Sequence, residues 1–238
     1  RRAANILPLP PAVLYPRIII LSSLPSLKSS FSELKSTTAS LVIIKSANDK
    51  MAKLVLNCET DFVAKSEDFT SLLPNLVEKI LSDGIEKTKE DAKNLINPVI
   101  QKTGENIQVG EVYLLEGNSL GGYVHSNKIG VMVSLEGGNS EIAKDIAMHV
   151  AAMKPEYIFP EEITEENKKI MLEIFEKEVA AINKPEEIKK KMLAGKIESY
   201  FKEKTLMNQP FIKNPNETIA QLLEKAKAKI KEIKRIAI

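Results

Sequence analysis

A unit of two short strands followed by an amphipathic helix occurs twice in this sequence, and the repeat restricts the folds available to the chain. In residues 40–82, two runs of strand-forming residues flank a turn-like segment, which predicts a β-hairpin followed by a helix. In residues 122–154, a second hairpin precedes a helix that begins near Ser140 and ends at Pro155. This duplication predicts an α+β fold, in which small antiparallel sheets pack on helices.

The helix of each unit has one apolar face, which predicts the side that packs on its sheet. In the first unit, apolar residues recur at helical spacing: Phe69, Leu72, Leu73, Leu76, Val77 and Ile80. In the second unit, the same spacing joins Ile142, Ile146, His149, Val150 and Met153. Within the first helix, Pro74 predicts a kink or a boundary, because proline removes a helical hydrogen bond.

The last third of the chain is predicted to be mostly helical. One helix is expected at 164–181 and another at 185–204, where a proline stands at the first helical position. Residues 209–212 are interpreted as a linker, and the T-x-x-Q capping box at 218–221 begins a short helix. Alternating apolar and charged residues at 230–238 predict a final strand.

These patterns divide the chain into an N-terminal segment at 1–37 and two subdomains at 38–118 and 119–238. The second subdomain contains a helical insertion at about 164–204. The segment 1–37 is rich in Pro, Leu and Ser and has one acidic residue, Glu33. Its composition resembles an organelle transit peptide, while a non-native extension and a disordered arm are equally weighted alternatives.

Composition and missing motifs exclude several classes of function. The net charge of +2 is too small to indicate a nucleic-acid partner by itself. With Cys58, His125 and His149 as its only cysteine and histidines, the chain has little material for a metal centre, and no metal or cofactor is expected. No P-loop, dinucleotide fingerprint or membrane-spanning apolar run occurs, so direct nucleotide binding and membrane insertion are not predicted.

The residues also give little support for catalysis, and no catalytic residue is assigned. Cys58 and His149 could form a nucleophile–base pair, but nothing in their spacing supports it, and buried structural cysteines are usually inert. The basic stretches at 189–191 and 225–235 have acidic neighbours and no interleaved aromatic residue, which favours a solvated face over an RNA-binding patch. The chain is therefore predicted to act by binding another protein.

The segment Thr60–Val63, at the end of the first hairpin, is the strongest candidate for a contact with a partner. From the residues alone, a phenylalanine such as Phe62 is more often part of a core, and an aspartate after a strand, such as Asp61, is usually a turn or cap residue. A histidine on an apolar helix face, such as His149, is usually a hydrogen-bonded core residue.

The run VLNCETDFVA at 55–64 resembles the signature of elongation factor Ts, the guanine-nucleotide exchange partner of elongation factor Tu in bacteria and organelles. The similarity extends over about residues 38–236, and the two related subdomains of that family would explain the repeat. The family's ubiquitin-associated-like domain is not recognisable in residues 1–37, nor is its glycine- and glutamate-containing strand beyond Ile238. Further segments resemble the family in the same order: 123–125, 128–131, 143–152, 154–157, 209–211 and 218–223.

This resemblance implies that the chain binds elongation factor Tu, in its GDP-bound and nucleotide-free states, and promotes GDP release. Asp61 and Phe62 would enter the partner beside its Mg²⁺–GDP site. His149 would contact partner residues that affect the partner's phosphate loop. The residues implied to contact the partner are Thr60, Asp61, Phe62, Val63, Ile129, Gly130 and His149.

The same resemblance leaves the assembly and the compartment open. A homodimer and a 2:2 complex both remain, and the compartment is the bacterial cytoplasm, or a mitochondrion or plastid if residues 1–37 are a transit peptide. The alternative function is that of an RNA-binding or ribosome-associated α+β protein without exchange activity.

Overall fold

The computed structural model describes residues 18–20 and 39–238 of the chain. The predictions for the segment 1–37 therefore lie outside the described residues, apart from a short strand, β1 (Ile18–Ile20). The described part is α+β, as predicted, and contains the two expected hairpin–helix units.

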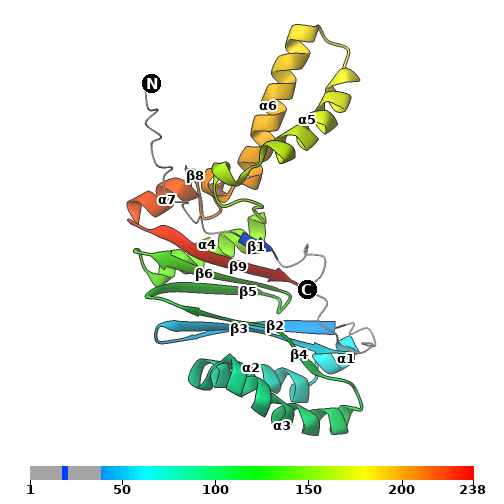
Figure 1. Ribbon diagram of the computed structural model, residues 1–238, viewed down its shortest axis with the longest axis vertical. Helices are drawn as coiled ribbons and strands as arrows, with labels where there is room; N and C mark the ends of the chain where they lie inside the picture. Colours follow the sequence, from blue (N-terminus) through cyan, green and yellow to red (C-terminus); the bar gives the residue numbers. More distant parts are fainter. Residues whose placement is uncertain (1–17, 21–38) are drawn as a thin grey trace, which may run out of the picture.

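The first half is a three-stranded antiparallel sheet covered on one face by two helices (Figure 1). The sheet has the order β2–β3–β4, and its strands are β2 (Ala39–Ala47), β3 (Lys50–Cys58) and β4 (Gln108–Glu116). The two covering helices are α2 (Glu67–Asp83) and α3 (Ile85–Thr103), and the single helical turn α1 (Asp61–Ala64) precedes them. The predicted hairpin and helix are confirmed, but α2 continues through Pro74, so a helix boundary at that residue is wrong.

The second half also consists of a sheet with a helix packed on it, but its strands and helix are arranged differently. Its sheet has the order β1–β9–β6–β5, in which β1 runs parallel to β9 and the other pairs are antiparallel. The elements of this layer are β5 (Ser119–His125), β6 (Ile129–Glu136), β9 (Lys229–Ala237) and the covering helix α4 (Ser140–Met153). The final strand predicted at 230–238 is thus confirmed as β9.

Helix α4 lies unusually close to its sheet. A Cβ atom added to Gly121 of β5 would lie 2.0 Å from the backbone nitrogen of Lys144. Of the predicted inner face of α4, Ile146, His149 and Val150 are buried, whereas Ile142 is partly buried and Met153 is 45% exposed. Met153 is the last residue of the helix.

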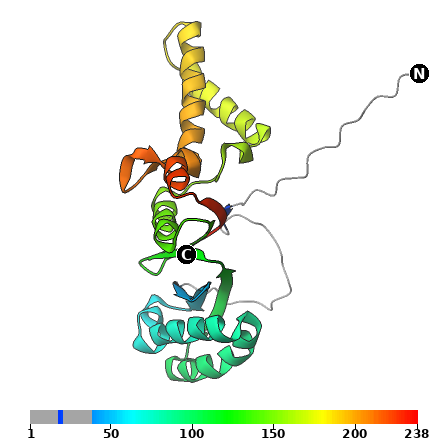
Figure 2. The same ribbon diagram turned by 90° about the vertical axis from the view of Figure 1, so that its left-hand side faces the viewer.

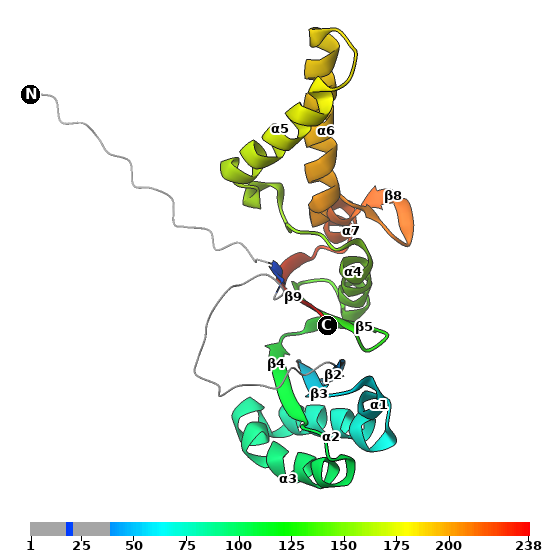
Figure 3. The same cartoon turned by 90° about the vertical axis from the view of Figure 1, so that its right-hand side faces the viewer.

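A helical hairpin extends away from the two sheets (Figure 3). It consists of α5 (Glu165–Ala180) and α6 (Glu186–Lys204), which confirms the two predicted helices. The segment expected to be a linker, 209–212, is instead part of a small folded region, because Gln209 and Phe211 are buried. The remaining short elements are η1 (Pro160–Glu162), η2 (Leu206–Asn208), β7 (Pro210–Phe211), β8 (Asn214–Thr218) and α7 (Ile219–Lys225), and α7 begins with the predicted capping box.

The two sheets pack face to face, so the layers run from α2 and α3 through both sheets to α4 (Figure 2). Gly122 and Gly130 permit close contact, because their added Cβ atoms would lie 2.7 Å from Ile44 Cγ2 and 3.0 Å from Val42 Cγ2, respectively. The apolar part of this contact consists of Ile44, Met51, Tyr113, Leu115, Leu120 and Met132.

A charged cluster completes the contact between the sheets. Lys53, whose side chain is fully buried, pairs with Glu111 in the first sheet. Tyr113 donates a hydrogen bond to Glu232 of the second sheet (2.6 Å), and Lys234 lies 4.7 Å from the Tyr113 ring centroid. Since Lys53 is desolvated by burial, its pKa is lowered despite the carboxylate of Glu111. The orientation of the two halves therefore depends on buried charges as well as on apolar packing.

Candidate functional site

The single turn α1 carries the most exposed large hydrophobic side chain of the described residues. Phe62 is 86% exposed, while the next side chain of this kind, Ile170, is 50% exposed. Val63 and Ala64, which follow Phe62, are buried in the core of the first half. The interpretation of Phe62 as a core residue is therefore wrong. Helix α1 presents the Phe62 ring to solvent, while the residues that follow it are anchored in the core.

Thr60 caps this turn, and each of its polar groups has a partner. Its Oγ1 accepts a hydrogen bond from the Val63 amide (3.2 Å), and its carbonyl accepts one from the Ala64 amide (3.2 Å). The Thr60 hydroxyl donates to Glu105 Oε1 (2.5 Å), and the Thr60 amide donates to Glu105 Oε2 (3.0 Å). The Cys58 thiol donates to the Thr60 carbonyl (3.2 Å). Thr60 thus links α1 to the strand before it and to the loop after α3.

Asp61, the first residue of α1, is exposed and lies beside Phe62. Its carboxylate accepts a hydrogen bond from Lys65 (2.9 Å), and this bond lowers the pKa of Asp61. Because both side chains are about four-fifths exposed, the pair contributes little to stability. Asp61 therefore presents a negative charge next to the aromatic ring.

The turn of the second hairpin lies at the same end of the molecule as α1. Val42 of β2 donates a backbone hydrogen bond to Asn127 (2.8 Å), and Lys128 Nζ donates to the Ser40 carbonyl (2.8 Å). Lys128 also helps to lower the pKa of Asp61, since its positive charge favours the carboxylate. The structure therefore brings the two hairpins together at one surface.

The predicted site residues of the second hairpin are less accessible than those of α1. Ile129 is half-buried, and Gly130 is buried between the two sheets. Within the segment Thr60–Val63, Thr60 is exposed and Val63 is buried. Asp61 and Phe62 are thus the members of the predicted set that offer the largest free surface.

His149 is fully buried and hydrogen-bonded on both ring nitrogens. Its Nδ1 accepts from the Ile212 amide (3.3 Å), so its Nε2 carries the proton and donates to Gln209 Oε1 (2.8 Å). Burial lowers the pKa of His149 and favours the neutral ring. The interpretation as a satisfied core histidine describes this environment, and a direct contact with a partner would require residues 209–212 to move aside.

Comparison with known proteins adds to this geometry. Residues 59–238, which include α1, α2 and the whole second unit of the repeat, match the family described as elongation factor TS. The chain belongs to the elongation factor Ts family. Elongation factor Ts of Thioalkalivibrio sulfidiphilus is 38% identical over 211 residues, covering 83% of this chain and 72% of the relative. Elongation factor Ts of Cellvibrio japonicus is 35% identical over 229 residues, covering 92% and 78%, respectively.

Membership of the elongation factor Ts family confirms the resemblance and places the chain among proteins of translation elongation. Elongation factor Ts of Pseudomonas savastanoi is 37% identical over 198 residues, covering 79% of this chain and 68% of the relative.

The structure does not bring Cys58 and His149 together. Cys58 lies in the hydrophobic cluster of the first half, and burial raises the pKa of its thiol. His149 packs near Phe211 of the second half, with ring centroids 6.2 Å apart. The described residues contain no group of three or more acidic, histidine or cysteine side chains that could hold a metal ion. In the same part of the chain, every helix is too short or too polar to cross a membrane.

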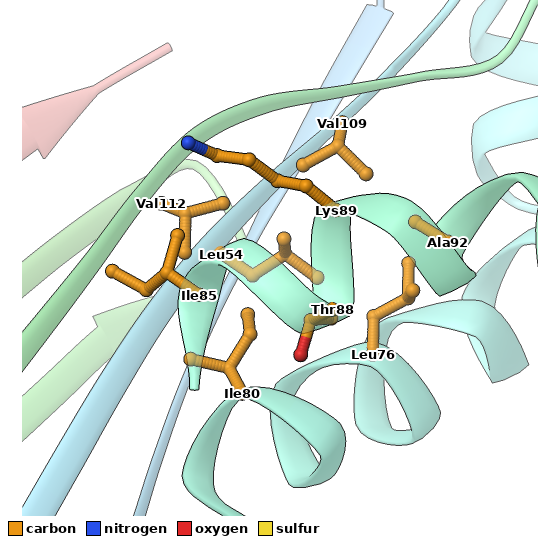
Figure 4. A pocket seen from close by; sticks show the side chains of 9 residues that line it. All are labelled: Leu54, Leu76, Ile80, Ile85, Thr88, Lys89, Ala92, Val109 and Val112. Atoms are coloured by element: carbon orange, nitrogen blue, oxygen red, sulfur yellow. The ribbon is translucent and has the colours of Figure 1, made fainter. Parts of the chain in front are cut away.

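A small apolar pocket in the first half is part of its core rather than of the predicted site (Figure 4). None of the predicted contact residues lines it, and the Thr88 hydroxyl is directed to the Gly84 carbonyl (2.7 Å). Its lining is formed by Leu54, Leu76, Ile80, Ile85, Thr88, Lys89, Ala92, Val109 and Val112.

Two residues that support the predicted contacts were missed by sequence reasoning. Glu105 holds Thr60, and Gln209 holds His149, in each case across a long stretch of chain. Gly104, with φ of 72°, gives the sequence a signal for the end of α3, but nothing adjacent indicates that Glu105 turns back toward Thr60.

Proposed function

We propose that this chain binds elongation factor Tu and promotes the release of GDP from it. The observation that carries this proposal is the 86% exposure of Phe62 on a turn whose neighbouring residues are anchored in the core. An exposed aromatic ring on a fixed base is suited to insertion into a pocket of a partner, where one such anchor can contribute about 2–4 kcal/mol.

The exchange itself requires binding energy and no covalent step. A protein that binds the nucleotide-free partner more tightly than the GDP-bound partner lowers nucleotide affinity by the same factor, because the two equilibria are linked. GDP is retained partly through Mg²⁺ and its oxygen ligands. We infer that Phe62 enters beside this site, while the Asp61 carboxylate perturbs the polar groups around the metal. On this mechanism the chain is not an enzyme and needs no cofactor of its own.

The second hairpin would extend the same contact surface. Hydrogen bonds between β2 and the turn at 126–128 hold this turn near α1, which supports a surface on which the subdomains at 38–118 and 119–238 would share one partner. Ile129 would contribute its exposed part, whereas Gly130 and His149 would act by shaping the surface. The bacterial relatives support the cytoplasm as the compartment of this interaction.

Stopped-flow measurement of labelled GDP release from elongation factor Tu tests the proposal. We expect the chain to accelerate release and to form a complex with nucleotide-free elongation factor Tu on a sizing column. An unchanged release rate at saturating protein, together with the absence of a complex, would overturn it. A salt titration of RNA binding provides the contrast, since a nucleic-acid-binding protein would show a steep salt dependence.

A further inference from the structure

A one-turn helix such as α1 cannot maintain its own conformation. Nucleating the first turn of a helix fixes several backbone angles for one hydrogen bond, so isolated short helices are unstable in water. The Phe62 side chain does not compensate for this, because it is exposed and gains little from burial in the free protein. Contacts from outside α1 must therefore determine the direction in which Phe62 projects.

The contacts made by α1 and its neighbours differ in which part of the turn they hold in place. Burial of Val63 and Ala64 holds the C-terminal end of the turn on the core. The ion pair between Asp61 and Lys65 is exposed and constrains little. The N-terminal end is defined by Thr60, whose extended backbone, with φ of −127° and ψ of 155°, directs the chain into the helix.

Glu105 is the side chain that holds Thr60 in this conformation. Its two carboxylate oxygens accept from the hydroxyl and from the backbone amide of Thr60, at 2.5 and 3.0 Å. Hydrogen bonds to an ionised acceptor are stronger than neutral ones, and two of them on one residue fix both its position and its orientation. Glu105 is itself placed by the left-handed backbone of Gly104 at the end of α3, and its amide donates to Thr103 Oγ1 (3.3 Å).

We propose that Glu105 is a positioning residue for Phe62 and Asp61, acting through Thr60, and that it sets the affinity for the partner. This inference rests on the proposed function of α1. Without Glu105, α1 populates other conformations in addition to the binding-competent one. The apparent dissociation constant is inversely proportional to the competent fraction, so a fall of that fraction to about one tenth weakens binding about tenfold.

The binding arm of the test compares Glu105→Ala and Glu105→Gln with the unchanged chain, using nucleotide-free elongation factor Tu. We expect about tenfold weaker binding for E105A and a change within about threefold for E105Q, which retains an acceptor oxygen for Thr60. Lys102→Ala is the matched control, because it removes an exposed ion pair with Asp68 (2.7 Å) at the same end of α3 without touching Thr60. Equal binding by E105A and K102A would overturn the proposal.

A double-mutant cycle separates positioning from an independent contact. If Glu105 acts through Phe62, E105A has little further effect on affinity in an F62A background. If the two effects add in full, Glu105 acts elsewhere and the proposal fails.

Hydrogen exchange of the free protein tests positioning without the partner. In E105A, we expect faster exchange of the Val63 and Ala64 amides, which bond to Thr60, and unchanged exchange in the core of α2. Unchanged exchange at Val63 and Ala64 would overturn the proposal. This arm also distinguishes the two ideas: if the unchanged chain does not bind elongation factor Tu but the exchange result holds, the proposed function fails while the positioning by Glu105 stands.

Discussion

The two halves connect their hairpin to their helix in different ways. In the first half, residues 59–66 lie between β3 and α2 and include the turn α1. In the second half, residues 137–139 join β6 directly to α4, and Gly137 and Gly138 have φ of 76° and 64°. A Cβ atom at Gly137 would lie 2.3 Å from the Lys227 carbonyl oxygen, so a side chain cannot be added at this position without moving the backbone nearby.

This difference gives the first half a projecting turn that the second half lacks. The hairpin and helix of both halves are positioned by apolar burial, which gives each half its own hydrophobic cluster. The extra turn of the first half is instead held by hydrogen bonds to Thr60 and by the burial of the residues that follow Phe62. We therefore expect that substitutions at α1 can alter the proposed binding while the scaffold remains folded.

The largest effect on stability is expected from the difference between the two halves in the distance from helix to sheet. Five residues before the hairpin turn, the first half has Ile43 and the second has Gly121. Gly121→Ala would drive a Cβ atom into the backbone of α4, and we expect a loss of about 4 kcal/mol or more in the free energy of unfolding. Urea denaturation measures this loss. Ile43→Ala is the matched change and should cost less, and equal costs would contradict the comparison.

A smaller but substantial loss of stability is expected when the charged contact between the halves is disrupted. Glu111→Leu leaves the buried Lys53 without its carboxylate, which should lower the free energy of unfolding by about 3 kcal/mol. Because the pKa of Lys53 is already lowered, the unfolded chain binds the proton more tightly than the folded chain, so stability should rise as pH increases toward 10.5.

The control for this change is the double variant with Lys53→Met and Glu111→Leu, measured by the same denaturation. Removing both charges should restore most of the lost stability, because no unpaired charge remains buried. A double variant as unstable as E111L would show that the pair is not the cause.

Phe62→Ala tests the connection that distinguishes the first half. We expect it to weaken binding to elongation factor Tu by about 2 kcal/mol or more, because an aromatic anchor is lost. Its effect on the free energy of unfolding should be below about 0.5 kcal/mol, since the ring is exposed. Titration calorimetry and thermal melting measure the two quantities. Ile170→Ala, on the exposed side of α5, is the control for loss of surface apolar area, and a parallel fall in melting temperature in F62A would place Phe62 in the core.

The smallest effect is a difference in pH dependence between the helices of the two halves. Ten residues after the helix cap, α2 has Leu76 and α4 has the buried His149. Because the pKa of His149 is lowered from 6.5, the unfolded chain takes up a proton first as pH falls through that value, and stability decreases. His149→Gln should make the decrease between about pH 7 and about pH 5 smaller. Denaturation curves at both pH values measure it, and identical slopes would mean that the His149 ring is not responsible.

Much of the fold could be predicted because it depends on local periodicity. The burial of Phe69 and Ile80 follows from their helical spacing, and the hairpins follow from alternation around turn residues. Exposure of Phe62 could not be predicted in this way, because a single aromatic residue has no period. The resemblance in the run at 55–64, rather than its composition, was what favoured an external contact.

The sequence by itself determined the repeat, the apolar faces of its helices and the short motif that marks the family, because each depends on residues that are close together in the chain. Tertiary structure alone decided which side chains hold that motif in place. Thr60 meets Glu105 across 45 positions, and His149 meets Gln209 across 60. Such contacts depend on how α3 ends and how residues 209–212 fold back, and no local pattern encodes them. The same reason applies to the packing of the two sheets, which buries Lys53 against Glu111 and joins two predictable halves into one surface.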